Sequence, residues 1–421
     1  MRKLITYILV DPIKGPMIAS YRGYMKGEVG RLILAWFLTA FSTGTMSYSL
    51  PYYIVEVLHF PGWIMGFVIT LTGLIMVIFS WPFGYISDKY GRRKVFILGG
   101  IFSCTAILLF AYIESFEQLL LAAFLSGLSG AMFGSSYNAL LADKAKSDSR
   151  AFSLSFFAGT IGMSIGGFFL SVLYPLQGFT GSSLTAHRVL FLSMAILGLG
   201  SPALAVTIPK ESYAEKREPF ILPRRSAHVL IPFLIASSLI ALGAGMIVPL
   251  MPYWLSLKFM IDDSISGPIL GFSTLLTAIS FLYAPRLAYK VGHVKAIVLS
   301  QGISTVFLVY LPFTPVFIIA GMIYAIRTLL MNMANPLQTS LIMGLVDERE
   351  RGLASGLSSA FWRLPHSISS YFGAYLMSSG MVDLPFFICA LLYITSISFF
   401  WMKFKKFEPK MREMQIISSS A

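Results

Sequence analysis

The sequence predicts an all-α integral membrane protein in which twelve transmembrane helices form two pseudo-symmetric six-helix bundles. Of its 421 residues, 56% are hydrophobic and 12% are charged, and the mean hydropathy is +0.75. A soluble domain could not bury that much apolar surface. Twelve largely apolar segments each reach the roughly 20 residues that a bilayer-spanning helix needs, and the two halves of the chain repeat one another.

Residues 1–30 are predicted to form a cytoplasmic or interfacial leader. Residues 4–10 are apolar but too few to span a bilayer. Lys14, Arg22 and Lys26 follow them, and such bases favour contact with an anionic membrane surface. The segment contains no small-residue cleavage site, so we expect no cleavable signal peptide.

The two predicted bundles occupy residues 31–208 and 228–402, joined by a polar cytoplasmic linker at 209–227 and followed by a cytoplasmic tail at 403–421. The predicted spans of the first bundle are 32–57, 62–86, 95–113, 119–142, 151–174 and 188–208. Those of the second bundle are 229–256, 267–288, 295–314, 316–341, 352–378 and 384–402.

The positions of the charged residues predict the topology. With both termini and every even-numbered loop on the cytoplasmic side, 28 of the 32 Lys and Arg residues fall on that side. Arg188 and Lys258 lie outside, and Arg327 and Arg363 lie within spans. Positive residues gather on the cytoplasmic side of membrane proteins. We therefore expect a multi-pass protein of the plasma membrane, in which the net charge of +13 reflects topology and not a nucleic-acid partner.

The two halves repeat at a constant offset of 201 positions, without gaps. This shift places Gly91 on Gly292 and Arg150 on Arg351. It also places Pro51 and Tyr52 on Pro252 and Tyr253. Parallel repeats of six helices about an axis along the membrane normal are a known transporter architecture. The repeat therefore predicts two related bundles.

A short charged turn between two apolar spans carries a recognisable motif. From Gly84 through Asp88 and Gly91 to Lys94 the residues follow the pattern Gly-x-x-x-Asp-Lys-x-Gly-Arg-Arg-Lys. This pattern resembles the signature loop between the second and third helices of the major facilitator superfamily (MFS). With the twelve spans and the repeat, the resemblance covers residues 31 to about 402. It leaves the subfamily open between drug/proton antiporter-like proteins and organic-solute permeases.

The resemblance implies a conformational latch at this turn. In the family, the loop acid docks near the start of the eleventh helix, and a loop arginine pairs with an acid ending the fourth helix. The matching residues in this sequence are Gly84, Asp88, Gly91, Arg92, Arg93, Asp143 and Arg351. The alternative from the residues alone is a local Asp–Arg pair at i, i+4 on a basic cytoplasmic turn, which stabilises by about 0–1 kcal/mol.

Two arginines lie deep inside predicted spans. Arg363 follows Arg351 by 12 residues, which places it about 18 Å along its helix. His366 shares its face three residues later. Arg327 lies mid-span in 316–341, where Asn335 and Gln338 add a polar stripe. Charges inside membranes tend to line cavities, so we expect these five residues to line a substrate cavity. The alternative is an arginine bonded to helix carbonyls or polar side chains inside a bundle.

Aromatic and amide side chains add weaker cavity candidates. Tyr48 and Tyr52 lie one turn apart in the first span, and Asn138 lies in the fourth. By the family resemblance, the first, fourth, seventh and tenth helices line the central cavity. Tyrosine supplies apolar surface together with a hydrogen bond, as small-molecule sites require. For Tyr52 the alternative is an aromatic belt at the outer interface.

The fifth span carries Gly159, Gly162, Gly166 and Gly167, and small residues at this spacing let helices approach closely. The run resembles the antiporter motif of the family, although Met163 stands where its central proline is expected. The arginine typical of the fourth helix in proton antiporters is absent from residues 122–127. These two departures weigh against proton-driven drug efflux.

The sequence indicates a transporter and not an enzyme, since it carries no Walker loop, no metal-ligand spacing and no signature of a cofactor. We expect a monomeric secondary transporter in the lipid bilayer that moves a small organic solute by alternating access, with a proton as coupling ion. The cavity arginines favour an organic anion or polar metabolite. Two alternatives remain: multidrug-type proton-coupled efflux of amphipathic compounds, and a non-transporting membrane sensor or scaffold with the same fold.

Overall fold

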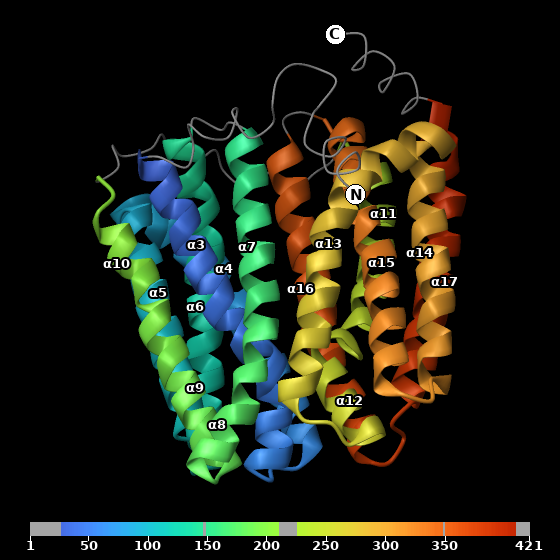
Figure 1. The fold of residues 1–421 in the computed structure, drawn as a ribbon. Coiled ribbons are helices and arrows are strands. Elements are labelled where there is room, and N and C mark those ends of the chain that lie inside the picture. The colour runs from blue at the N-terminus through green and yellow to red at the C-terminus, as the bar shows by residue number, and fades with distance from the viewer. Residues whose placement is uncertain (1–26, 146–148, 210–224, 348–349, 410–421) are drawn as a thin grey trace, which may run out of the picture.

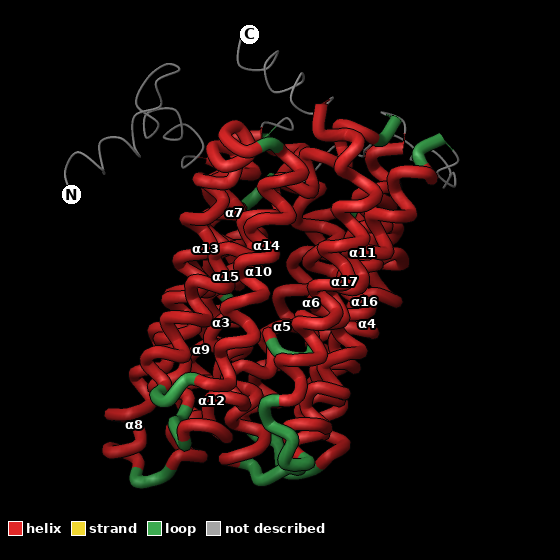
Figure 2. The backbone as a smooth tube through the Cα atoms, turned by 90° about the vertical axis from the view of Figure 1, so that its right-hand side faces the viewer, coloured by secondary structure: helices red, strands yellow, loops and turns green. Residues whose placement is uncertain are grey.

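The computed structural model describes residues 27–145, 149–209, 225–347 and 350–409; of residues 149, 150, 282, 285 and 351–353 only the backbone is described. Its described elements are helical and form two bundles that lie side by side, the first blue to green and the second yellow to red in Figure 1. Long helices run nearly from end to end of the molecule, and most connections gather at its two ends (Figure 2). The predicted all-α, two-bundle fold is confirmed.

The first bundle is built from helices α3 to α10, several of them interrupted. These are α3 (Gly27–Tyr52) with a π-helical turn (Tyr53–Val57), α4 (Gly62–Tyr90), α5 (Arg92–Ala111), α6 (Phe116–Lys144), α7 (Ser149–Phe169), α8 (Leu173–Thr180), α9 (Ser183–Gly198) and α10 (Gly200–Val206). The predicted fifth span is α7 and α8 joined by a 3-10 turn, and the sixth is α9 and α10.

The second bundle repeats this plan. It contains α11 (Ala227–Gly245), α12 (Met251–Phe259), α13 (Asp263–Val291), α14 (His293–Tyr310), α15 (Phe317–Leu345), α16 (Arg351–Ser378) and α17 (Leu384–Phe404). The predicted seventh span is α11 and α12 joined by the 3-10 turn Val248–Leu250. Most of the predicted leader (1–26), linker (210–224) and tail (410–421) lies outside the described residues.

Within the described residues, eleven helical segments are long and apolar enough to cross a membrane. The predicted span at 352–378 is not among them, although α16 forms a helix of 28 residues there. Its serines and Arg363 lower its hydropathy. Because α16 packs between α4 of the first bundle and α11 of its own, much of its surface meets protein and not lipid. It completes the twelfth position of the fold.

The internal repeat is visible in the backbone of two matching turns. Gly91 ends α4 with φ 110°, and Gly292 ends α13 with φ 103°. Side chains rarely adopt positive φ, so glycine is required at both turns. We call the end of the molecule that carries these turns the basic end. The first and last described residues also lie at this end (Figure 1).

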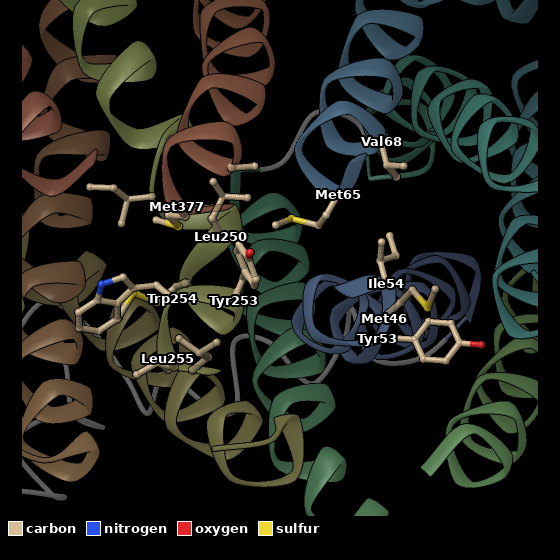
Figure 3. Packing of buried hydrophobic residues seen from close by; sticks show 14 of the residues in the cluster. Met46, Tyr53, Ile54, Met65, Val68, Leu250, Tyr253, Trp254, Leu255 and Met377 are labelled. Atoms are coloured by element: carbon tan, nitrogen blue, oxygen red, sulfur yellow. The ribbon is translucent and has the colours of Figure 1, made fainter. Parts of the chain in front are cut away.

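At the opposite end, which we call the closed end, buried residues of the two bundles lie against each other. Met65 of α4 points toward Leu250 and Tyr253 of the second bundle, and all three are buried (Figure 3). A Cβ on Gly66 would lie 2.8 Å from the carbonyl oxygen of Ser370 in α16. This packing brings α4 of the first bundle into direct contact with the second bundle at the closed end.

Candidate functional site

A cavity of about 500 Å³ lies between the two bundles. Side chains from both bundles line it, chiefly from α3, α4, α5, α13 and α15. Its hydroxyl groups come from Thr43, Ser47, Tyr48, Thr72, Ser103, Ser126, Ser273, Thr274, Thr277, Tyr324 and Thr328. Asn332 and His366 add polarity, and Met46, Met65, Met163 and several aliphatic side chains supply apolar surface.

The described residues that line this cavity include no carboxylate, lysine or arginine. A larger hollow of about 830 Å³ lies over α13, α14 and α15, where aliphatic side chains such as Ile279 and Leu299 share the lining with Arg286, Lys290 and two serines. These three helices all belong to the second bundle, so this hollow does not lie between the two bundles. The central cavity, apolar with many hydrogen-bonding groups, has the chemistry of a small-molecule site.

Two of the predicted cavity residues line it. The hydroxyl of Tyr48 lies 2.5 Å from that of Thr274, so this hydrogen bond joins α3 of the first bundle to α13 of the second. His366 reaches the cavity from α16, and its ring stacks on Trp362 with centroids 6.3 Å apart. Tyr48 therefore lines the cavity and also forms a hydrogen bond between the two bundles.

Arg327 does not line the cavity in this structure, which corrects the prediction for this residue. Its side chain is 2% exposed, and its Nη2 donates to the hydroxyl of Tyr393 in α17 at 2.7 Å. The cavity face of α15 carries Thr328 and Asn332, which lie about 100° and 140° around the helix from Arg327. The arginine faces the inside of its own bundle, which was the stated alternative.

Arg363 lies at the interface of the bundles but outside the cavity lining. Its side chain is exposed, and Nη1 lies 3.1 Å from the sulfur of Met76 in α4. A thioether is a weak acceptor, and the lining residue His366 is one turn away. Arg363 is thus placed where an anion approaching the cavity could meet it.

The remaining candidates lie on either side of the cavity. Asn335 is exposed and donates to Asn332 at 3.0 Å, and Asn138 of α6 is also exposed. Both lie on helices that contribute to the cavity lining, on the side of the cavity toward the basic end. Gln338 is half-buried and is not a lining residue. Tyr52 lies toward the closed end, where its ring stacks on that of His187.

The predicted latch residues meet as two ion pairs at the basic end. Arg92 contacts Asp88 at 3.2 Å and Asp143 at 2.5 Å, and it also donates to the carbonyl of Ala139. Arg93 donates to the carbonyl of Ile208. Asp88 lies in the last turn of α4 and not in a loop, because the helix continues to Tyr90.

Docking of the latch on the second bundle stays a prediction. The side chain of Arg351 lies outside the described residues. Its neighbour Glu350 accepts hydrogen bonds from the backbone N–H groups of Arg225 and Ser226, at 3.2 and 2.9 Å. Glu350 therefore holds the start of α11 against that of α16.

The glycines of the predicted fifth span give the close approach expected of them. A Cβ on Gly162 would lie 2.8 Å from the carbonyl of Phe37 in α3. On Gly167 it would lie 2.7 Å from Cα of Gly271 in α13. The first contact holds α7 in its own bundle, and the second joins α7 to the other bundle.

A buried polar cluster at the closed end was not predicted from the sequence. His187 of α9 lies 3.0 Å from Asp263 of α13, and Ser49 of α3 donates to the same carboxylate oxygen. Asp263 was assigned to a loop before the span 267–288, and His187 to the edge of the span 188–208. A histidine and an acid at the edges of apolar spans were the available signal, but nothing in the sequence paired them.

Comparison with known proteins agrees with this architecture. Residues 32–230 and 233–414 match the Major Facilitator Superfamily. The quinolone resistance protein NorA of Staphylococcus aureus (strain MSSA476) is 24% identical over 345 residues, which cover 80% of this chain and 86% of NorA. The solved structure of the nucleoside transporter NupG superposes with a TM-score of 0.73 at 15% identity, covering 90% of this chain and 100% of that one.

A second solved structure, a bacterial homolog of the human lysosomal transporter Spinster in an inward-facing and occupied conformation, gives a TM-score of 0.71 at 13% identity. The superposition covers 91% of this chain and 97% of that one. At these identities the two solved structures establish the fold alone. The matched residues, by contrast, span nearly the whole sequence, and the chain belongs to the Major Facilitator Superfamily as a multi-pass, non-enzymatic membrane transporter.

Proposed function

We propose that this transporter moves amphipathic organic compounds with polar and aromatic parts through the central cavity. The observation that carries the proposal is the lining itself, in which hydroxyl groups and methionines alternate without a fixed charge. Methionine adapts its shape to different ligands, and hydroxyl groups both donate and accept. The similarity to NorA, whose name records quinolone resistance, supports export of such compounds.

We further propose that the basic end faces the cytoplasm and that transport proceeds by alternating access, driven by a proton gradient. The count of positive loop residues supports this orientation. The packing of Met65 against Tyr253 at the closed end and the exposed Asn138 and Asn335 toward the basic end support a state that opens inward. Two bundles that rock about a central site are the general mechanism of such folds.

Arg363 favours a second candidate, an organic anion. Its guanidinium is exposed one helical turn from the cavity lining, and its Nη1 lies against the thioether sulfur of Met76. Arginine binds carboxylate and phosphate groups in a bidentate manner. A substrate with both an aromatic body and one acidic group would use the cavity and Arg363 together.

Transport into proteoliposomes with an imposed pH gradient tests these proposals. The panel contains neutral amphipathic aromatics, lipophilic cations and organic anions, and the variants are Arg363→Gln and, as a matched control, the exposed Arg286→Gln on the larger hollow. The first proposal expects neutral or cationic aromatics to move equally well in both variants. The second expects an anion to move and to lose at least about tenfold in rate in Arg363→Gln alone, which corresponds to about 1.4 kcal/mol. Failure of every compound refutes both.

A further inference from the structure

The Ser49–His187–Asp263 cluster, which the transport proposal does not use, joins the two bundles at the closed end. All three side chains are fully buried, each with 0% exposure. Ser49 and His187 belong to the first bundle and Asp263 to the second, so the cluster exists only while these parts are together. Burying an acid and a histidine is costly unless the two side chains are hydrogen-bonded to each other.

The hydrogen bonds fix the proton content of this cluster. Nδ1 of His187 lies 2.7 Å from the backbone carbonyl of Ser183. A carbonyl oxygen only accepts, so Nδ1 carries a hydrogen. Nε2 lies 3.0 Å from Oδ2 of Asp263. Without a further proton, a lone pair on Nε2 would face the carboxylate, and the contact would be repulsive. The pair therefore holds one proton between these two atoms.

Asp263 is held at the start of a helix in the second bundle. It lies in the first turn of α13, where the positive end of the helix dipole stabilises a carboxylate. Its Oδ1 is buried and without a hydrogen-bond partner among the described residues. The geometry places the shared proton between Nε2 of His187 and Oδ2 of Asp263.

Other titratable groups near the cluster are exposed or occupied. Asp262 accepts from the hydroxyl of Ser264 at 2.6 Å and caps α13. Arg188 donates to the carbonyl of Ala111, and Lys258 pairs with Asp383 at 2.6 Å. Glu56 is exposed. The rings of Tyr52 and Tyr53 stack on His187, with centroids 6.3 and 5.2 Å away.

We propose that the Ser49–His187–Asp263 cluster is a proton-binding site that locks the closed end of the transporter. When the bundles separate there, Asp263 leaves His187, and both side chains reach water. The imidazole then titrates near its ordinary pKa of about 6.5. Above that pH, closure takes up one proton that the open form lacks. The ratio of closed to open forms therefore rises about tenfold for each unit by which the pH falls.

This inference rests on the proposed alternating access but not on any substrate. Distances between spin labels in lipid nanodiscs test it without ligand. Phe179 of α8 is 92% exposed and Phe313 after α14 is 65% exposed, one at the closed end of each bundle. Cysteines at these positions carry the labels after Cys104 and Cys389 are replaced by serine.

The label distances are recorded between pH of about 6.5 and 8.5, above the ordinary histidine pKa. The expected result is a short distance whose population grows as the pH falls. In His187→Gln the amide still donates to Asp263, so the end can close, but the pH dependence disappears. His59→Asn, which removes an exposed histidine before α4, keeps the full dependence.

A wild-type distribution that does not change with pH would overturn the proposal, and so would a His187→Gln protein with the wild-type slope. If His187→Gln does not fold, Asp263→Asn replaces it, and the same loss of slope is expected. Because no substrate is present, failure of these experiments is distinct from failure of the transport proposal, which the proteoliposome panel measures.

Discussion

The contact between Gly271 and α7 gives a sharp test of how the bundles close. In Gly271→Ala the new Cβ would lie 2.6 Å from the carbonyl oxygen of Ser164 and 3.0 Å from the backbone N of Phe168. Both neighbours are backbone atoms of α7, so no side chain can rotate away. The hydroxyl of Ser164 also donates to the carbonyl of Gly271 at 2.8 Å, which holds the two helices in register.

The overlap is relieved only if the bundles move apart at this contact. Overpacking of a fitted interface costs about 1–3 kcal/mol. The cost falls on the form with the closed end packed, because α7 and α13 belong to different bundles. A bias of that size changes the ratio of closed to open forms by about 5- to 150-fold. We therefore expect Gly271→Ala to populate an open end.

The assay is the distance between spin labels at positions 179 and 313, together with the thermal unfolding midpoint. Gly302→Ala is the matched control, because a Cβ on Gly302 of α14 meets nothing within 4 Å. Both variants gain the same helix propensity. The reasoning is refuted if the two variants give the same distance distribution, or if Gly271→Ala unfolds each bundle instead of separating them.

Three further predictions follow from single contacts. Tyr393→Phe removes the acceptor of the buried Arg327 guanidinium, and thermal unfolding in detergent should show a loss of about 1–3 kcal/mol. Arg92→Lys keeps the charge but loses contact with one of its two carboxylates; because the site is partly exposed, the same measurement should show about 1 kcal/mol or less. Tyr48→Phe removes a bond between the bundles worth about 0.5–1.5 kcal/mol, so spin-label distances should shift toward the open form.

The fold could be predicted from the sequence because its signals are local or periodic. Apolar length identified the spans, and the offset of 201 residues related the bundles. Gly91 and Gly292 then proved to adopt the same positive φ. The breaks inside the fifth, sixth and seventh spans were missed, since a short 3-10 turn within an apolar run leaves hydropathy unchanged.

The site was harder to predict because it depends on which face of a helix meets which neighbour. A mid-membrane arginine is expected to face protein, and Arg327 does so. Its guanidinium, however, donates to the hydroxyl of Tyr393 in α17, and its side chain does not line the cavity. Tyr48 and His366, which were predicted for the same cavity, do lie among its lining residues, and their contact with a substrate stays a prediction.

The Ser49–His187–Asp263 cluster could not be predicted for the same reason, since it depends on contacts between residues far apart in the sequence. Its acid and its histidine are 76 residues apart and come from different bundles. Each of the two residues lies next to the end of a predicted span, where a polar residue is ordinary. The sequence does not show that these two span ends lie side by side in the folded protein. Only the closed packing of the bundles brings them within hydrogen-bond distance.

Blocking the central cavity is the most direct test of transport through it. Ser47 lines the cavity and is exposed to it, so Ser47→Trp fills the space without disturbing a buried contact. Leu391→Trp adds the same side chain on α17, where Leu391 is 65% exposed. Counterflow of a transported aromatic compound in proteoliposomes should vanish in Ser47→Trp and persist in Leu391→Trp. Equal counterflow in the two variants would contradict transport through this cavity.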